Sequence, residues 1–154
     1  MHHNLKLRVA NKDDTLMYFE WVNDADVRLQ SFNSDPVLWK NHQEWYEQKL
    51  LDQNCLMLVL EENHTPIGQI RFDIHDGVAY IDYSIDKKNR GRNFGEILVR
   101  EGMKFVSNIN RSVIFHADVK RQNIASTKIF NKLGFNEQEV DDPDVRQFVF
   151  YLRG

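Results

Sequence analysis

Two spacings of apolar residues recur along the chain and predict a succession of strands and helices. Alternating or short continuous apolar runs, which are typical of strands, cover 5–9, 55–60, 67–74, 78–85, 113–119, 135–140 and 147–152. Spacings of three and four residues, which are typical of helices, cover 16–22, 42–51, 93–107 and 123–133, with a short helical turn around Val27 and Leu29. The polar segment 62–66 and the pair Asp76-Gly77 are the expected hairpin turns. The pattern predicts a mixed α/β sheet flanked by helices, in a single domain spanning 1–154.

Composition narrows the class of protein. The chain has 154 residues, which suits one domain with a full core, and its net charge of −3 disfavours general nucleic-acid binding. No apolar run approaches the roughly 18 residues of a membrane span, and no signal peptide opens the chain. We therefore expect no membrane partner and a cytoplasmic location. The oligomeric state is left open, with a homodimer as one alternative.

A single cysteine, Cys55, excludes an internal disulfide. It begins the apolar run Cys55–Leu60, which favours a buried strand cysteine over a catalytic thiol.

The segment 79–105 carries the strongest functional signal. An apolar strand ends at Ile85, a glycine-bearing turn follows, and a helical pattern starts near Asn93. This order leaves free backbone N–H groups at a helix N-terminus, which is a site suited to pyrophosphate. The turn also holds four basic side chains, at Lys87, Lys88, Arg90 and Arg92. The Walker A and GxGxxG patterns are both absent, so the turn fits neither of these common phosphate-binding motifs.

Two motifs, one within 79–105 and one within 117–135, resemble those of the GNAT superfamily of acetyl-CoA-dependent N-acetyltransferases. Arg90 and Gly95 match the ends of its Arg/Gln-x-x-Gly-x-Gly/Ala signature, and Asn93 replaces the middle glycine. Asn tolerates a left-handed backbone better than most residues, so the motif survives the change. The segment 117–135 is similar to the next family segment, an Asn-x-x-Ala/Ser followed by Leu-Gly-Phe, at Asn123, Ser126 and Leu133–Phe135.

The resemblance implies a central, mostly antiparallel sheet that splays between two strands, with acetyl-CoA as co-substrate and no metal. The backbone near Ser84 and Ile85 would hold the acetyl group and pantetheine, and Asn123 would contact the pantetheine arm. Lys128 would reach an adenosine phosphate, or would be a solvated helix lysine. The full set of residues that the resemblance assigns to acetyl-CoA is Ser84, Ile85, Lys87, Arg90, Gly91, Arg92, Asn93, Phe94, Gly95, Asn123, Ser126 and Lys128.

Two positions depart from the catalytic pattern of the family. Tyr80 stands where many relatives carry a glutamate base, and Phe130 stands where many carry a tyrosine acid. The remaining catalytic candidates are Asp82, on the same strand face as Tyr80, and His116 on the neighbouring strand. Either one of these groups accepts the amine proton, or the acceptor amine is weakly basic and the pH profile follows the acceptor. We prefer the second alternative on the sequence alone.

The N-terminal third is expected to shape the acceptor site. It is similar to GNAT proteins of pseudaminic and legionaminic acid pathways, which implies a nucleotide-linked amino sugar as the small-molecule partner. Arg28 could pair with phosphate, whereas Trp21 and Trp45 either stack on the ligand or pack helices together. Acetylation of a protein N-terminus or a polyamine is an alternative, and a non-catalytic acyl-CoA-binding module is an alternative of another class. The acceptor candidates are Trp21, Asn23, Arg28, Phe32, Asn33 and His42.

Overall fold

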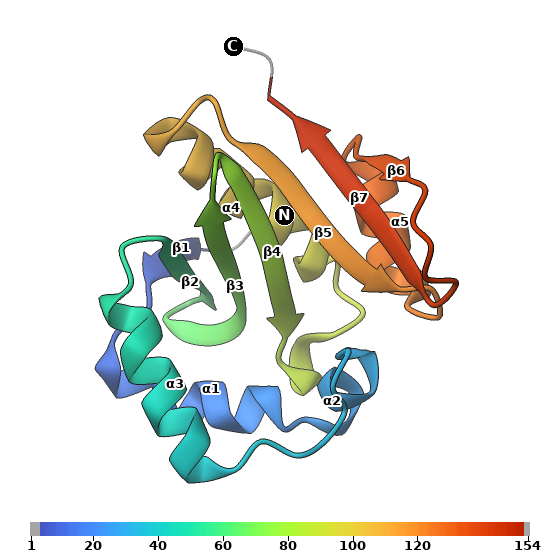
Figure 1. Ribbon diagram of the computed structural model, residues 1–154. Coiled ribbons are helices and arrows are strands. Elements are labelled where there is room, and N and C mark those ends of the chain that lie inside the picture. Colours follow the sequence, from blue (N-terminus) through green and yellow to red (C-terminus); the bar gives the residue numbers. More distant parts are fainter. Residues whose placement is uncertain (1–3, 153–154) are drawn as a thin grey trace.

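A seven-stranded mixed sheet forms the centre of the protein (Figure 1). The computed structural model describes residues 4–152, and its strands lie in the order β1-β2-β3-β4-β5-β7-β6. Among the strands of residues 4–152, only the β4–β5 pair is parallel, so the sheet is mostly antiparallel as the family resemblance implied. The strands are β1 (Leu5–Val9), β2 (Cys55–Glu62), β3 (Thr65–His75), β4 (Val78–Ile85), β5 (Ile114–Lys120), β6 (Asn136–Gln138) and β7 (Val145–Tyr151).

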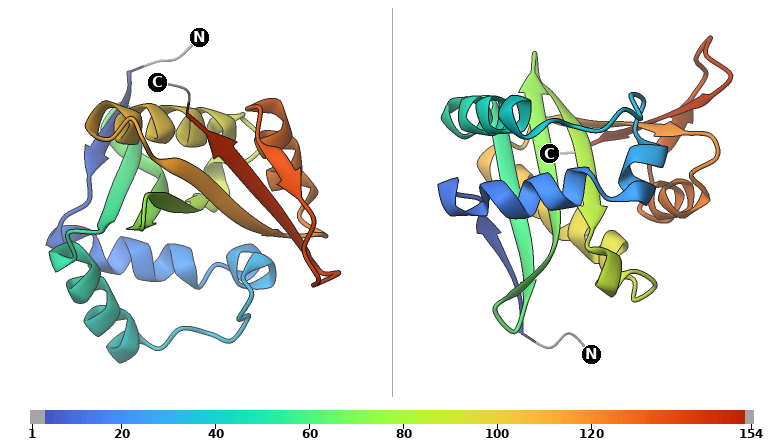
Figure 2. Two further views of the ribbon diagram at one scale, coloured as in Figure 1. Left: turned by 45° about the horizontal axis from the view of Figure 1, so that its top comes forward. Right: turned by 90° about the horizontal axis from the view of Figure 1, so that it is seen from below.

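Helices cover both faces of the sheet (Figure 2). On one face, α4 (Phe94–Ile109) and α5 (Ile124–Lys132) pack on the main core, which includes Leu58, Ile70 and Phe115. The other face carries α1 (Thr15–Val22), α2 (Ala25–Gln30) and α3 (Trp39–Leu51), and α1 and α3 pack on a smaller apolar cluster. Alternation along β2 produces both layers, because Leu58 points to the main core and Met57 to the smaller cluster.

The pairing of β4 with β5 ends early, and this opens the sheet. The two strands pair at only three positions, of which the last is Tyr80 with His116. Beyond it, 81–85 stays paired with β3 on one side, whereas β5 continues alongside β7. The edge of β4 that faces β5 is therefore without a strand partner over 81–85. This is the splay that the family resemblance implied, and it lies next to the N-terminus of α4.

Element boundaries agree with the sequence predictions to within a few residues. The third helix begins at Trp39 rather than His42, and β7 begins at Val145 rather than Gln147. The first hairpin is tighter than expected, because β2 and β3 extend toward each other and leave Asn63 and His64 as the turn, with φ values of 50° and 70°. Two successive positive φ values suit a two-residue hairpin between right-twisted strands.

Candidate active site

The segment between β4 and α4 forms a cradle of backbone amides. Asn93 precedes α4 with φ 64° and makes no side-chain cap, so the first-turn N–H groups of α4 have no side-chain acceptor. Gly91 has φ 79°, and a Cβ there would meet no heavy atom within 4 Å. Lys87 and Lys88 are exposed beside this segment. Uncapped amides, open space above the glycine and two exposed ammonium groups fit the pyrophosphate of acetyl-CoA.

Two of the basic residues predicted to face phosphate are already paired with carboxylates. Arg90 Nη2 lies 2.8 Å from Asp24 Oδ2, and Arg92 Nη2 lies 3.1 Å from Glu62 Oε2. Burial alone would raise the pKa of Asp24, but the bond and charge of Arg90 hold it below its ordinary value. Both arginines therefore anchor the turn to neighbouring parts of the protein.

A second link joins the same turn to the N-terminal helices. The indole Nε1 of Trp21 donates to Asp86 Oδ1 at 3.0 Å, and Asp86 Oδ2 accepts from the Lys88 amide at 3.2 Å. With the Arg90–Asp24 pair, this fastens the corner between α1 and α2 to the turn that precedes α4. Trp21, predicted to contact the acceptor, therefore also has a structural bond.

The open edge of β4 lies beside residues of α5 that the resemblance assigned to acetyl-CoA. Asn123 accepts the amide of Ser126 at 3.1 Å and so caps α5, and the Ser126 hydroxyl lies 2.6 Å from the Tyr83 hydroxyl. Burial raises the pKa of Tyr83 to about 12. Lys128 is exposed, as both of its interpretations required. Asn123 and Ser126 thus build the wall of the splay, while their contact with pantetheine stays a prediction.

Four polar side chains of β3 and β4 form a connected row on the face covered by α1–α3. Gln69 donates to Ser84 Oγ at 3.1 Å and to Asp82 Oδ2 at 3.3 Å. Arg71 Nη1 lies 3.8 Å from the same Asp82 oxygen. Asp82, a catalytic candidate, therefore points to the acceptor side but already faces an amide and a guanidinium.

The other two catalytic candidates lie together at the start of the splay. The rings of Tyr80 and His116 have centroids 4.8 Å apart, as their pairing in the β4–β5 ladder requires. His116 Nε2 lies 3.0 Å from Asp118 Oδ1. Asp118 was not among the sequence candidates, although a residue two positions along a strand shares a face with the first.

Three acceptor candidates have structural roles instead of open side chains. Arg28 donates to the carbonyls of Val22, Asn33 and Asp35 at 2.6, 2.9 and 3.1 Å and to Ser31 Oγ at 3.1 Å. These bonds occupy its guanidinium, which contradicts the prediction that Arg28 pairs with phosphate.

Asn23 exchanges two hydrogen bonds with the backbone of Val37. His42 is 2% exposed and its Nε2 lies 2.8 Å from the Thr15 carbonyl oxygen, so it lies in the core and not in an acceptor site. Asn33 remains exposed, with its side chain accepting the Asp35 amide at 3.0 Å.

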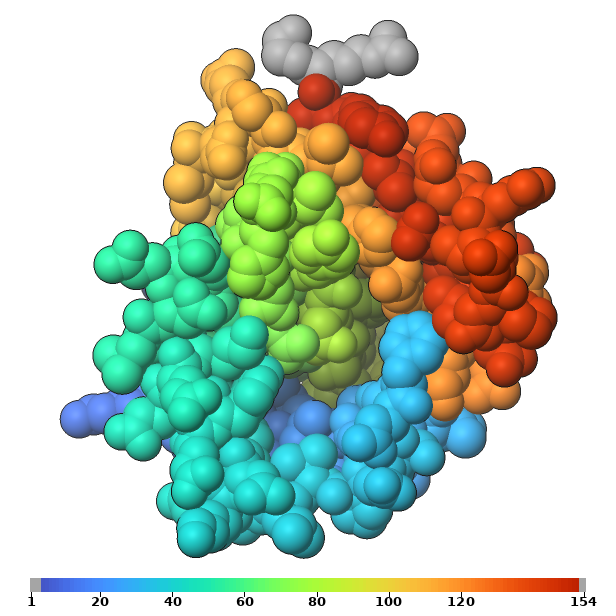
Figure 3. Space-filling model, viewed as in Figure 1, coloured from blue at the N-terminus to red at the C-terminus, as the bar shows by residue number. Residues whose placement is uncertain are grey.

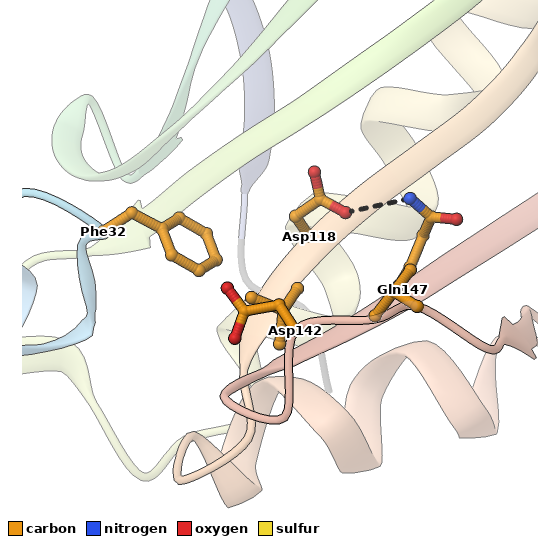
Figure 4. A pocket seen from close by; sticks show the side chains of 6 residues that line it. Phe32, Asp118, Asp142 and Gln147 are labelled. Carbon is orange, nitrogen blue, oxygen red and sulfur yellow. Dashed lines mark hydrogen bonds between the residues drawn. The ribbon is translucent and has the colours of Figure 1, made fainter.

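Phe32, an acceptor candidate, is 58% exposed and lines a pocket, and its contact with the acceptor stays a prediction. The pocket lies between the α2–α3 loop, β5 and the β6–β7 loop (Figure 4). In Figure 3 the light-blue α2–α3 region lies next to the orange and red C-terminal part on this face of the molecule. Asp118, Asp142 and Gln147 reach the pocket from β5, the β6–β7 loop and β7. Its wall therefore combines one aromatic ring with two carboxylates, neither of which the sequence had singled out.

Two further features bear on the class of chemistry. Within residues 4–152, no group of three or more His, Cys, Asp or Glu side chains is arranged to hold a metal ion. Among the helices that the structure describes, none is long and apolar enough to cross a membrane.

Comparison with known proteins identifies the family. Residues 4–136 match the Acetyltransferase (GNAT) domain. A search of curated protein sequences gives no significant match.

Similar solved structures include spermidine N-acetyltransferase from Vibrio cholerae in complex with CoA and spermine, with TM-score 0.87, 18% identity and coverage of 96% of this chain and 95% of that one. AAC(6')-Ib in complex with paromomycin and acetyl-CoA has TM-score 0.82, 22% identity and coverage of 96% and 93%. RimL, a ribosomal L7/L12 α-N-protein acetyltransferase in complex with CoA, has TM-score 0.82, 16% identity and coverage of 96% and 94%.

The strand order, the splay beside α4 and the domain match together confirm the fold class predicted from the sequence. The chain belongs to the GNAT family and is an acetyl-CoA-dependent N-acetyltransferase.

Proposed function

We propose that the protein transfers the acetyl group of acetyl-CoA directly to a primary amine on a small acceptor that carries further positive charge. The observation that supports this acceptor class is the pocket wall, in which Asp118 and Asp142 stand across from Phe32. Carboxylates attract ammonium groups, and an aromatic face also favours cations. Polyamines and amino sugars with several amines both have this character.

A nucleotide-linked amino sugar, predicted from the sequence, is the second candidate. The exposed ring of Phe32 favours it, because an aromatic face can stack on a base or sugar. However, the Arg28 guanidinium already donates to backbone carbonyls of the loop and is not open to a phosphate. The pocket carboxylates also repel a diphosphate. An amino sugar without the nucleotide meets neither objection.

Similar proteins act on comparable acceptors. The neighbours described above are named for spermidine, for an aminoglycoside complex and for a protein N-terminus. The first two acceptors carry several amines, which agrees with a pocket that holds carboxylates. At identities below 25%, these likenesses suggest the acceptors to test and do not choose among them.

Direct transfer, without an acetyl-enzyme, is the mechanism that the site supports. Cys55 lies on β2, and burial and the nearby Asp73 carboxylate raise the pKa of its thiol to about 12. A thiol of this kind is a poor nucleophile at neutral pH because little thiolate is present. The acetyl group therefore passes directly from the thioester to the amine while both substrates are bound.

Thiol release from acetyl-CoA tests the proposal across matched acceptors: spermidine, an aminoglycoside, glucosamine, its UDP-linked form and a peptide with a free N-terminus. We expect the two multiply charged amines to give the highest kcat/KM, with a KM that rises with salt. Asp142→Asn is expected to raise that KM roughly two- to fivefold at low salt. Asp141→Asn is the matched control, because Asp141 is exposed on the same loop but does not line the pocket.

The opposite ranking would reject the charged-acceptor proposal. If the UDP-linked sugar is the best acceptor and Asp142→Asn improves its turnover, the acceptor is anionic. If no amine releases thiol while acetyl-CoA still binds by calorimetry, the protein is the acyl-CoA-binding module considered from the sequence.

A further inference from the structure

His116 and Asp118 form a hydrogen-bonded pair at the point where β4 and β5 separate. Both side chains lie on the face of β5 that carries the acceptor pocket, and Nε2 of His116 is 3.0 Å from Oδ1 of Asp118. The ladder between the two strands ends at Tyr80 and His116, so the imidazole stands beside the first unpaired residues of β4. His116 is therefore the last residue of β5 that pairs with β4, at the start of the splay.

The surroundings of the imidazole define its orientation. The Tyr80 ring from β4 lies against it at 4.8 Å, and Val149 of β7 pairs with it in the ladder. Gln147, also from β7, is opposite Asp118 and donates a weak bond of 3.5 Å to the same Oδ1. The His116 side chain is 16% exposed and that of Asp118 is 44% exposed, so the imidazole is held by its neighbours, and Asp118, which lines the pocket, is the more exposed of the two.

We propose that His116 accepts the proton of the acceptor amine and that Asp118 is the residue that positions it. An ionised carboxylate only accepts hydrogen bonds, so Asp118 favours the tautomer with hydrogen on Nε2. The lone pair is then on Nδ1, which is the atom that takes the proton. The inference rests on the proposed function, because the proton comes from the amine that is acetylated.

The step balances without any further reactant. Nδ1 of His116 takes one proton from the bound ammonium group, and the neutral nitrogen then forms a bond to the thioester carbonyl carbon as the C–S bond breaks and the sulfur takes its electron pair. The second proton that the nitrogen loses passes to the thiolate, and the proton on His116 passes to solvent. Thiolate is a good leaving group, so the absence of a tyrosine acid at Phe130 does not block the step.

Asp82 is a weaker choice for the same role. Its Oδ2 already faces the Gln69 amide at 3.3 Å and the Arg71 guanidinium at 3.8 Å. A base on His116 also changes the preference drawn from the sequence, where no protein base was favoured. A basic amine such as that of a polyamine needs a proton acceptor more than a weakly basic sugar amine does.

The tautomer of His116 provides a test that does not depend on activity. Two-bond ¹H–¹⁵N spectra of the labelled protein, recorded at alkaline pH, should show hydrogen on Nε2. Asp118→Asn should populate the Nδ1–H form, and Asp118→Glu should retain the Nε2–H form in part. Hydrogen on Nδ1 in the unaltered protein would overturn the proposed orientation.

Kinetics test the role of the pair. Asp118→Asn should lower kcat roughly 10- to 100-fold, and His116→Ala roughly 100-fold or more, with little change in KM for acetyl-CoA. Added imidazole should restore part of the rate of His116→Ala. The kcat/KM profile of the unaltered protein should stay fixed for two acceptors whose amine pKa values differ by about one unit. Asp141→Asn is again the control and should match the unaltered protein.

A profile that moves with the acceptor amine, or a His116→Ala variant that retains most of its rate, overturns the inference and leaves the acetyltransferase intact. The absence of thiol release from the unaltered protein with every amine overturns the proposed function itself, so the two failures are distinguishable.

Discussion

Replacement of Arg28 by lysine separates the two roles that this residue has been given. The substitution keeps the positive charge, which is all that a simple phosphate contact needs, but loses the planar fork that reaches several acceptors. In the structure that fork makes four hydrogen bonds, to the carbonyls of Val22, Asn33 and Asp35 and to the Ser31 hydroxyl. Arg28→Lys is therefore expected to loosen the loop between α2 and α3.

The size of the effect follows from those bonds. A hydrogen bond contributes about 0.5–1.5 kcal/mol net, and water can reach the acceptors of a partly exposed side chain. Loss of most of the four bonds should thus lower the free energy of local opening by about 2–4 kcal/mol. Since about 1.4 kcal/mol corresponds to a factor of ten, the open population should rise roughly 30- to 700-fold.

Limited proteolysis measures this opening. Phe32 and Leu38 are 58% and 65% exposed, so chymotrypsin should nick the loop at these residues once it opens. We expect much faster nicking of Arg28→Lys, a higher acceptor KM because Phe32 is displaced, and little change in the melting temperature because the opening is local.

One result would refute this reasoning. If Arg28→Lys is nicked as slowly as the unaltered protein, while Arg28→Ala loses affinity only for phosphate-bearing acceptors, the residue contacts phosphate and the loop does not depend on it.

Three further predictions concern stability, mechanism and the acetyl-CoA site. Burial tends to raise the pKa of Asp14, but its bonds from Arg8 at 2.8 Å and the charge of Arg8 lower it. Stability from this pair is therefore present above the unfolded pKa and lost as pH falls through the lower folded pKa. Asp14→Asn should cost about 2–4 kcal/mol in urea unfolding at pH 7, and this cost should shrink steadily as the pH is lowered below the unfolded pKa of about 3.9; a cost that does not change with pH would exclude the ion pair as the cause. Cys55→Ser should keep most of the turnover, and mass spectrometry should find no acetyl group on Cys55; a trapped acetyl-cysteine would contradict direct transfer. Gly95→Glu should abolish acetyl-CoA binding in calorimetry. Gly95→Ala is the control, because any Cβ at Gly95 already meets Ile129 Cδ1 at 2.9 Å. Equal affinities of the two variants would place the pyrophosphate elsewhere.

The sequence predicted the order and type of the main elements because each has a clear period. The two faces of β2 and the amphipathic α4 bury one side only, and that constraint is visible in the spacing of apolar residues. The splay was also predicted, but only through the family resemblance. In the structure the splay arises because β4 and β5 stop pairing after Tyr80 and His116, and the spacing of apolar residues does not indicate where pairing stops.

Predictions of individual side-chain roles were less accurate in the acceptor region. Arg28 and Asn23 lie in a polar stretch that suits ligand binding, yet the same polarity suits a loop whose backbone must be hydrogen-bonded. The sequence cannot distinguish the two uses, because both require donors near turn residues. His42 occupies the buried side of α3, and that position depended on where the helix packs. Asp118 could have been found, since it shares a strand face with His116.

The two bonds between the α1–α2 corner and the turn before α4 are expected to couple the binding of the acceptor to the affinity for acetyl-CoA. Arg90–Asp24 and Trp21–Asp86 connect the segment that leads to Phe32 with the segment beside the uncapped amides of α4. A change that shifts one segment must strain or break these bonds, and thermodynamic linkage makes the effect reciprocal. Exchange of the acceptor loop for that of a relative should therefore alter acetyl-CoA affinity as well as acceptor choice, unless Asp24 and Trp21 are kept.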